Sequence, residues 1–207
     1  MTNKFKILCF LLSITLNYNF SLLAQTNLTS SNSINFDYYL NLAEQYRDSI
    51  GNKDLYYANQ ALNYAEKEND NSKIVKALIL IAEISKDNGN LDNSLKCLNK
   101  ALPLCKQIDD QDLLHSVYLD LGIIYKNLNQ IDLAIEYHNL ALELAEQQND
   151  IINQALCLNN IGNIYISQDN FSKALYYYKL TLKLFTNPEI NSNLYIATLN
   201  NIAVIYM

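Results

Sequence analysis

Few side chains in this sequence have the types and spacing that catalysis or metal binding requires. There are two histidines among 207 residues, and neither has a partner at the spacing typical of metal ligands. We expect His115 to begin a helix and His138 to occupy a packing position. The sequence contains no glycine-rich phosphate loop and no nucleophile elbow. It therefore predicts no enzyme activity, no metal site and no cofactor.

A cluster of carboxylates is the other candidate for chemistry. Asp109, Asp110 and Asp112 could bind a cation, but they lie where a helix is predicted to start. Carboxylates at such a position accept hydrogen bonds from the free amides of the first turn and oppose the helix dipole. We therefore expect helix capping here rather than cation binding.

The balance of charge argues against nucleic acid as a partner. Asp and Glu number 21 against 15 Lys and Arg, and Arg47 is the only arginine. An acidic surface repels a phosphate backbone, so no nucleic-acid partner is expected. Cys97, Cys105 and Cys157 are expected to be small buried hydrophobic residues. Cys97 and Cys105 lie roughly 12 Å apart if they share one helix, which is too far for a disulfide.

Composition indicates which elements carry these side chains. Hydrophobic residues make up 50% of the chain, whereas there are only 4 Gly and 2 Pro. So many apolar residues argue against intrinsic disorder, and so few turn-forming residues argue against a β-sandwich or barrel. The composition therefore favours a helical protein.

A pattern of about 40 residues recurs along the chain. An aliphatic residue followed by a small one recurs at spacings of 39, 40, 40 and 41, namely at Leu42-Ala43, Ile81-Ala82, Leu121-Gly122, Ile161-Gly162 and Ile202-Ala203. Tyr118, Leu121, Gly122 and Tyr125 lie at offsets that place them on one face of a helix. A second helical segment follows in phase, with small residues at Ala61, Ala101, Ala141 and Thr181. Polar turn residues separate the segments, so we predict a tandem array of helical hairpins.

The period divides the chain into units. We predict a repeat array over residues 36–207, with units at 36–74, 75–114, 115–154 and 155–195 and the first helix of a fifth, truncated unit at 196–207. Asp54 and Leu55 fall near the position of a small residue in the first unit, so we expect its second helix to be short. Ser85 replaces a tyrosine of the other units. Pro103 lies inside a second helix, which we expect it to kink.

These segments resemble a known family. Tyr118-x-x-Leu121-Gly122-x-x-Tyr125, followed by Ala134-x-x-x-His138-x-x-Ala141, resembles a tetratricopeptide repeat. A closer resemblance is carried by Leu158-Asn159-Asn160-Ile161-Gly162-Asn163-x-Tyr165 with Phe171, Ala174, Tyr178 and Thr181. The family's period is 34, so a period of 40 implies the extended variant with longer second helices. The resemblance covers residues 36–207 and implies an all-α fold, an α-α superhelix of antiparallel helical hairpins.

The resemblance also implies where a ligand binds. In this family the first helices line a concave groove that holds a peptide or a segment of a partner protein. Residues beside each aliphatic-small pair face that groove, and a carboxamide there can donate to and accept from a peptide backbone. The candidate ligand-binding residues are Asn41, Glu44, Glu83, Asp120, Asn159, Asn160, Asn163, Asn200 and Asn201. Chaperone-binding relatives clamp a carboxylate with two lysines, but Lys76 and Lys126 lack the matching asparagines, so a chaperone terminus is not expected.

The start of the chain has the features of a secretory signal. Lys4 and Lys6 precede an apolar run from residue 7 to 16, and a small-residue cleavage site precedes Gln25. The run is about half of the ~20 residues that a membrane-spanning helix needs. We therefore predict a signal peptide at 1–24, a linker at 25–35, and an exported protein that is periplasmic or associated with the cell envelope.

Two functions remain open at this point. The first is an exported, non-catalytic scaffold that binds a protein or peptide segment. The second is the periplasmic sensory region of a membrane-bound histidine kinase or LuxR-type regulator, because exported arrays of 40-residue units resemble such regions. An apolar helical pattern that continues to Met207 favours this second function. It would imply a membrane tether through a missing C-terminal segment.

Overall fold

The computed structural model describes residues 35–47, 52–185 and 192–207, and every secondary-structure element in these ranges is an α-helix. The predicted signal peptide at 1–24 and the predicted linker, apart from Asn35, lie outside the described residues. Within the described ranges, none of the helices has the combination of length and hydropathy that crossing a membrane requires. The structure confirms the predicted all-α class.

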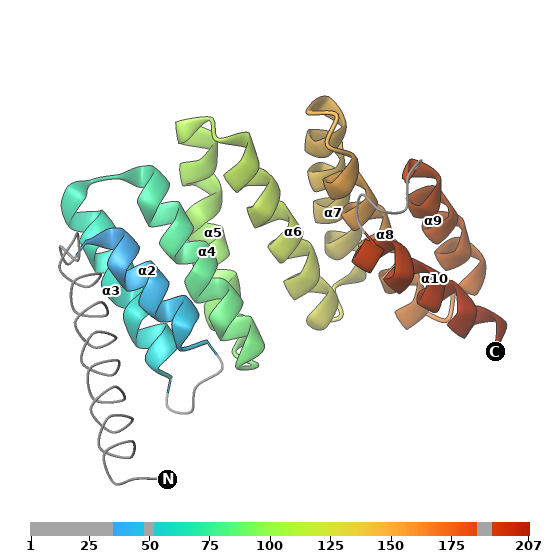
Figure 1. The fold of residues 1–207 in the computed structure, drawn as a ribbon, viewed down its shortest axis with the longest axis horizontal. Helices are drawn as coiled ribbons and strands as arrows, with labels where there is room; N and C mark the ends of the chain where they lie inside the picture. The colour runs from blue at the N-terminus through green and yellow to red at the C-terminus, as the bar shows by residue number, and fades with distance from the viewer. Residues whose placement is uncertain (1–34, 48–51, 186–191) are drawn as a thin grey trace, which may run out of the picture.

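The helices form antiparallel pairs that follow one another along the array (Figure 1). The pairs are α2 (Phe36–Gln45) with α3 (Lys53–Glu68), α4 (Asn71–Asp87) with α5 (Leu91–Ile108), α6 (Gln111–Asn127) with α7 (Ile131–Gln147), and α8 (Ile151–Ser167) with α9 (Phe171–Leu184). The helix α10 (Ser192–Tyr206) packs against α9 and α8. The first helices of neighbouring pairs also contact each other, α4 with α6 and α6 with α8. This arrangement is the predicted α-α superhelix.

Aspartate side chains fix where the first helices begin. Asp70, Asp110 and Asp150 each accept a hydrogen bond from the backbone N–H three residues further on, at 3.0–3.1 Å. The capping role expected for Asp110 is therefore confirmed. These caps start α4, α6 and α8 four residues before the predicted unit boundaries at 75, 115 and 155. His115 consequently lies inside α6 and not at its start, because the cap precedes the apolar pattern by about one turn.

The turns repeat at half the period of the hairpins. Every twentieth residue from 69 to 169 has a positive φ between 54° and 76°, namely Asn69, Gly89, Asp109, Asn129, Asn149 and Asp169. Short polar side chains tolerate this left-handed conformation better than other non-glycine residues. Asn and Asp therefore adopt the positive φ at most of these turns, where other proteins commonly use glycine. This explains how the array forms its turns with so few glycines.

Glycine is used instead where the two helices of a pair cross. A Cβ atom at Gly122 would lie 2.6–2.8 Å from three atoms of the His138 ring, and one at Gly162 would lie 2.5–3.1 Å from the Tyr178 ring. Both rings are about 1% exposed. The two preceding pairs have alanine at the equivalent position and a non-aromatic residue opposite, in the combinations Ala43 with Ala58 and Ala82 with Leu98. In the third and fourth hairpins a ring and a glycine thus fill the helix crossing, whereas in the first two hairpins an alanine and a smaller side chain fill it.

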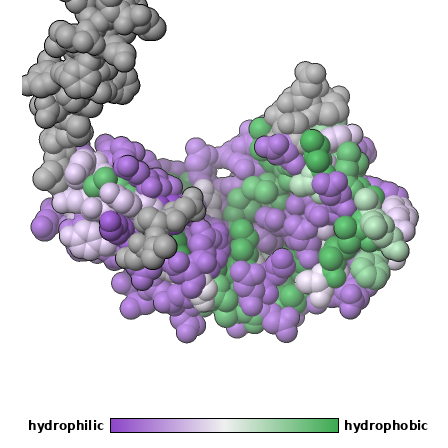
Figure 2. All heavy atoms as spheres, turned by 60° about the horizontal axis from the view of Figure 1, so that its bottom comes forward, coloured by the Kyte–Doolittle hydropathy of each residue, from purple (hydrophilic) through white to green (hydrophobic). Residues whose placement is uncertain are grey.

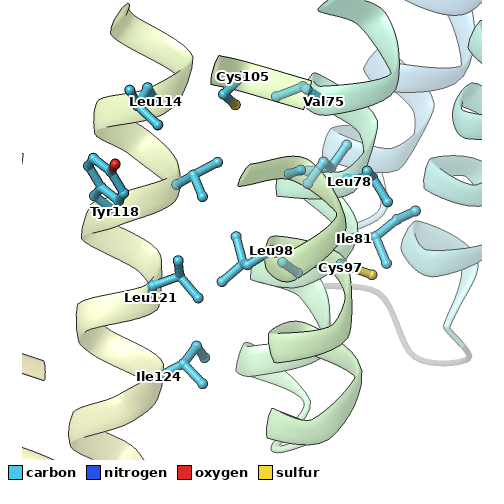
Figure 3. Close-up of a cluster of buried hydrophobic side chains, with 14 of the residues drawn as sticks. Val75, Leu78, Ile81, Cys97, Leu98, Cys105, Leu114, Tyr118, Leu121 and Ile124 are labelled. Atoms are coloured by element: carbon cyan, nitrogen blue, oxygen red, sulfur yellow. The ribbon is translucent and has the colours of Figure 1, made fainter. Parts of the chain in front are cut away.

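A continuous core fills the space between successive pairs. Figure 3 shows Leu114, Tyr118, Leu121 and Ile124 on α6, with Leu121 and Ile124 directed toward α5. Their spacing of three and four residues places them on one helical face. The opposing side chains include Val75, Leu78, Leu98 and Cys105. Cys97, Cys105 and Cys157 are all buried free thiols, as expected.

Two expected irregularities take a different form in the structure. The second helix of the first pair is not short, because α3 has 16 residues and α9 has 14. Asp54 is accommodated in its first turn, where its carboxylate is buried and accepts a 2.7 Å hydrogen bond from the N–H of Leu55. A carboxylate at this end of a helix is favoured by the helix dipole. The other helix, α5, continues through Pro103 from Leu91 to Ile108.

Candidate functional site

Two hollows lie along the row formed by the first helices. The N-terminal hollow has a volume of about 400 Å³ and is lined by Leu40, Asn41, Glu44, Lys76, Ile79, Leu80, Glu83, Leu113 and Ser116 of α2, α4 and α6. The C-terminal hollow has a volume of about 290 Å³ and is lined by Lys126, Asn163, Ile166, Ser167, Tyr178, Asn201 and Val204 of α6, α8, α9 and α10. Five of the nine predicted site residues therefore line a hollow, namely Asn41, Glu44, Glu83, Asn163 and Asn201.

The N-terminal hollow is lined by both apolar and charged side chains. Leu40, Leu80 and Leu113 come from three successive first helices and form part of the apolar lining. Glu44 and Glu83 stand at equivalent positions of α2 and α4. Such a surface can pack an aliphatic side chain and bind a polar or cationic group at its end.

Arg47 connects the carboxylates beside this hollow. Its guanidinium lies 3.5 Å from Glu44, 3.0 Å from Glu83 and 3.1 Å from Asp87. One cation therefore faces three carboxylates, and these pairs join α2 to α4. Because the carboxylates outnumber the cation, the local charge is negative.

A second ion pair continues the row of charges onto the next helix. Lys86 Nζ lies 3.5 Å from Asp120 Oδ1, with side chains 21% and 13% exposed. Burial raises the pKa of Asp120 to about 6, which Lys86 opposes and Glu83 reinforces. Asp120 thus lies on the predicted row but is already paired within the chain.

The C-terminal hollow is built around one carboxamide. Asn163 Oδ1 accepts a 2.7 Å hydrogen bond from the Tyr178 hydroxyl and a 3.0 Å hydrogen bond from Asn201 Nδ2. These two bonds leave its Nδ2 without a partner among the described residues. Lys126 lines the same hollow. Asn163 and Lys126 therefore both present N–H donors, which suit the carbonyl oxygens of a peptide.

The surface character changes along the array. On the face in Figure 2, hydrophilic residues cover most of the N-terminal half on the left, whereas hydrophobic residues gather over the C-terminal half. On α10 the exposed large apolar side chains are Ile196, Leu199, Val204 and Tyr206. A ligand that spans both hollows would therefore meet charge at one end and apolar surface at the other.

Three predicted site asparagines lie outside the two hollows. Asn159 is only 6% exposed, and its Oδ1 accepts a 3.1 Å hydrogen bond from Thr198 Oγ1 of α10. It therefore joins α8 to α10, and its prediction as a groove residue was wrong. Neighbouring residues on a helix point about 100° apart, which separates Asn159 from the half-buried Asn160. Asn200 is exposed and is the α10 equivalent of Asn159.

The histidines and cysteines form no activated pair among the described residues. His115 Nε2 lies 3.8 Å from Cys157 Sγ, but burial lowers the pKa of His115 and raises the pKa of Cys157 to about 12. Both groups are therefore neutral, and a neutral thiol is a poor nucleophile. Burial, with a smaller effect from Lys126, lowers the pKa of His138 to about 4. The described residues include no group of three side chains able to hold a metal ion.

Sequence reasoning missed several residues that hold the predicted site residues in place. Arg47 and Lys86 stand three positions after Glu44 and Glu83, Arg47 in the turn that follows α2 and Lys86 in the last turn of α4. Extending the repeat comparison by one turn would have found both. Tyr178 has a weaker signal, because its position was interpreted as packing, and the structure shows that its hydroxyl also holds Asn163.

The comparisons with known proteins agree with this geometry. The tetratricopeptide repeat family matches residues 73–147 and 115–187, which together exceed half of the chain. No curated protein sequence matches. Among solved structures, the chain resembles a signal transduction ATPase with a tetratricopeptide repeat sensor from Pyrococcus horikoshii, with a TM-score of 0.72 and 20% identity over 83% of this chain and 27% of that one.

Two further solved structures that the chain resembles are complexes. A Rap protein complexed with Competence and Sporulation Factor has a TM-score of 0.71 and 19% identity over 83% of this chain and 51% of that one. NprR in complex with its cognate peptide NprX has a TM-score of 0.63 and 22% identity over 78% and 48%. The chain spans about half or less of the length of these three proteins, and identities this low establish the fold alone. With the repeat, the fold and the family match in agreement, the chain belongs to the tetratricopeptide repeat family.

Proposed function

We propose that the row of first helices binds an extended peptide or protein segment without catalysing a reaction. The observation that carries this proposal is the state of Asn163, which lines a hollow and whose oxygen is held by two hydrogen bonds while its N–H groups have no partner among the described residues. A side chain fixed in this way is ready to donate to a ligand without first losing its own bonds. The complex of NprR with its cognate peptide NprX supports the same class of ligand.

Substitution of Asn163 by aspartate tests this proposal. The change keeps an oxygen that can accept from Tyr178 and Asn201, but it replaces the N–H donors by a second oxygen. Binders selected from a random dodecapeptide display library against the intact chain provide the probes. We expect N163D to weaken these peptides by roughly tenfold, because a lost hydrogen bond also leaves a peptide carbonyl unpaired.

The matched control is Asn139→Asp on α7, which adds the same charge at an exposed position of a second helix. It should leave the affinity of the peptides unchanged. The proposal would be rejected if the library yielded no saturable binder, or if both variants bound the peptides as tightly as the wild type.

We also propose that the protein is exported. Lys4, Lys6 and the apolar run from residue 7 to 16 support a signal that is cleaved before Gln25. Expression in a bacterial host followed by cell fractionation and N-terminal sequencing tests this. A chain in the cytoplasmic fraction that still starts at Met1 would contradict export.

A sensory region is the second candidate function. It is favoured by the solved relative from P. horikoshii, whose tetratricopeptide repeat is described as a sensor. The reading frame downstream of Met207 decides it. An apolar helix of ~20 residues followed by a kinase or helix-turn-helix domain would support the sensory role, whereas a stop codon would end it.

A further inference from the structure

A pair of stacked tyrosines recurs in the hairpins, one on each helix. Tyr46 stacks on Tyr57 at a ring-centroid distance of 5.5 Å. The equivalent pairs in the third and fourth hairpins are Tyr125 with Tyr137 at 5.3 Å and Tyr165 with Tyr177 at 5.5 Å. The tyrosine of the second helix thus packs beside the first helix of its own hairpin in three of the four hairpins.

The second hairpin lacks both members of this pair. Ser85 and Cys97 occupy the two positions, so a hydroxyl and a thiol replace two phenol rings. The Ser85 hydroxyl is held by a 2.7 Å hydrogen bond from Asn93 Nδ2. In Figure 3, Leu98 points toward Leu121 of α6, whereas Cys97 points to the opposite side of α5, where Ile81 lies.

A pocket of about 420 Å³ is found at this place. It is lined by residues of the second helices α3 and α5 and by the buried Leu78 and Ile81 of α4. Cys97, which is 7% exposed, lines it at the position where Tyr137 and Tyr177 stand in the later hairpins. The volume falls within the range of small-molecule sites. The pocket is separate from both hollows, because it lies mainly between second helices.

The polar side chains at the pocket favour an anion with a hydrogen-bond donor. Lys96 and Lys100 line it and form no ion pair with a described residue. Both lysines act electrostatically on the Cys97 thiol, where each opposes the rise in its pKa that burial causes. Asn59 and Asn93 also line the pocket, and their Nδ2 groups donate to Leu55 O and Ser85 Oγ. Their carboxamide oxygens are therefore left to accept from a ligand.

We propose that this pocket binds a small planar aromatic acid, with its ring over Leu78 and Ile81 beside Cys97 and its carboxylate near Lys96 and Lys100. The ring would occupy space that tyrosine rings fill in three other hairpins, and the two lysines supply the complementary charge. No bond is made or broken, so the site is a binding site alone. It does not depend on the peptide-binding function proposed for the first helices.

Titration of the full ¹⁵N-labelled chain with 4-hydroxyphenylacetate, followed by amide NMR shifts, tests this proposal. We expect saturable shifts centred on residues 90–100 of α5. Cys97→Tyr places the ring of the other hairpins into the pocket, so it should abolish these shifts and raise the melting temperature. Persistence of the same shifts in folded C97Y would overturn the assignment, as would the absence of saturable shifts in the wild type.

The charge requirement is tested with exposed residues that do not affect folding. Lys96→Gln combined with Lys100→Gln should weaken binding by roughly two- to tenfold, as expected for two partly exposed ion pairs. The matched control is Lys179→Gln with Lys183→Gln, two exposed lysines four residues apart on α9, which should change nothing. 4-Methylphenol, which keeps the phenol but lacks the carboxylate, should bind more weakly than the acid. Equal binding by the pocket variant and the wild type, or by the phenol and the acid, would refute an anion site.

Discussion

The contact between Gly162 and the Tyr178 ring gives a prediction whose sign can be worked out from the structure. Alanine at an ordinary helix position is more stable than glycine by about 1 kcal/mol. At position 162, however, the new Cβ would lie 2.5 Å from Tyr178 Cε1, about 1 Å inside the usual carbon–carbon separation. Overpacking of a core costs about 1–3 kcal/mol.

The upper part of that range applies here, because the ring has little freedom to move. Tyr178 is 1% exposed, and its hydroxyl donates a 2.7 Å hydrogen bond to Asn163. Subtracting the gain in helix propensity leaves a net loss of about 1–2 kcal/mol for Gly162→Ala. For a chain of this size the melting temperature should fall by roughly 2–8 °C.

The control uses the combination that the second hairpin already contains. There Ala82 and Leu98 occupy the two equivalent positions, and both are fully buried. In a Tyr178→Leu background, Gly162→Ala should therefore cost nothing or stabilise the fold. Thermal and urea denaturation of the four proteins in this double-mutant cycle measure the coupling, which we expect to exceed about 1 kcal/mol. A rise in melting temperature on Gly162→Ala in the wild-type background would refute the steric argument.

Burial lowers the pKa of His138 to about 4. The neutral ring therefore makes its full contribution to folding stability above about pH 6.5, and this contribution is lost as the pH falls toward 4. Thermal melts should therefore show a smaller loss on acidification for His138→Leu than for the wild type. The raised pKa of Asp120, about 6, has the opposite sign, so Asp120→Asn should gain melting temperature relative to the wild type near pH 7.5 but not near pH 4. Asp110→Ala removes a helix cap and should cost about 1 kcal/mol in urea denaturation, whereas the exposed, non-capping Asp112 should tolerate alanine better. The first expectation would be contradicted if His138→Leu and the wild type lost equal melting temperature on acidification, and the second if the effect of Asp120→Asn were the same at both pH values. The third would be contradicted if alanine at 110 and at 112 cost equal free energy of unfolding.

The fold was predictable because the same spacing of small and large residues recurs in five units. Small residues 40 apart mark the helix crossings. The starts of the helices were less predictable. The apolar pattern begins only where a helix meets its neighbours, whereas Asp70, Asp110 and Asp150 begin the helix a turn earlier.

The site was predictable by helical face but not by partner. Glu44 and Glu83 are equivalent residues of successive first helices, and both line the N-terminal hollow. Asn163 and Asn201 follow and precede their aliphatic-small pairs respectively, and both line the C-terminal hollow. The sequence could not show that Asn159 turns toward Thr198, since one residue of helical rotation moves a side chain to another interface. It also could not show that Lys86 pairs with Asp120, because this ion pair joins different hairpins.

Comparison of the hairpins with one another carries more information than any one of them. Where the ring of His138 or Tyr178 lies on a second helix, glycine stands opposite, and where Leu98 lies there, alanine does. Residues on two helices thus change together, as expected when each crossing must fill the same volume. The same logic applies to the tyrosine stacks. Ser85 and Cys97 also change together, but the Ser85–Asn93 hydrogen bond does not replace the volume of two rings, and a pocket remains. A change in side-chain volume that the opposite helix offsets maintains the packing, whereas a loss of volume that nothing offsets leaves space for a ligand.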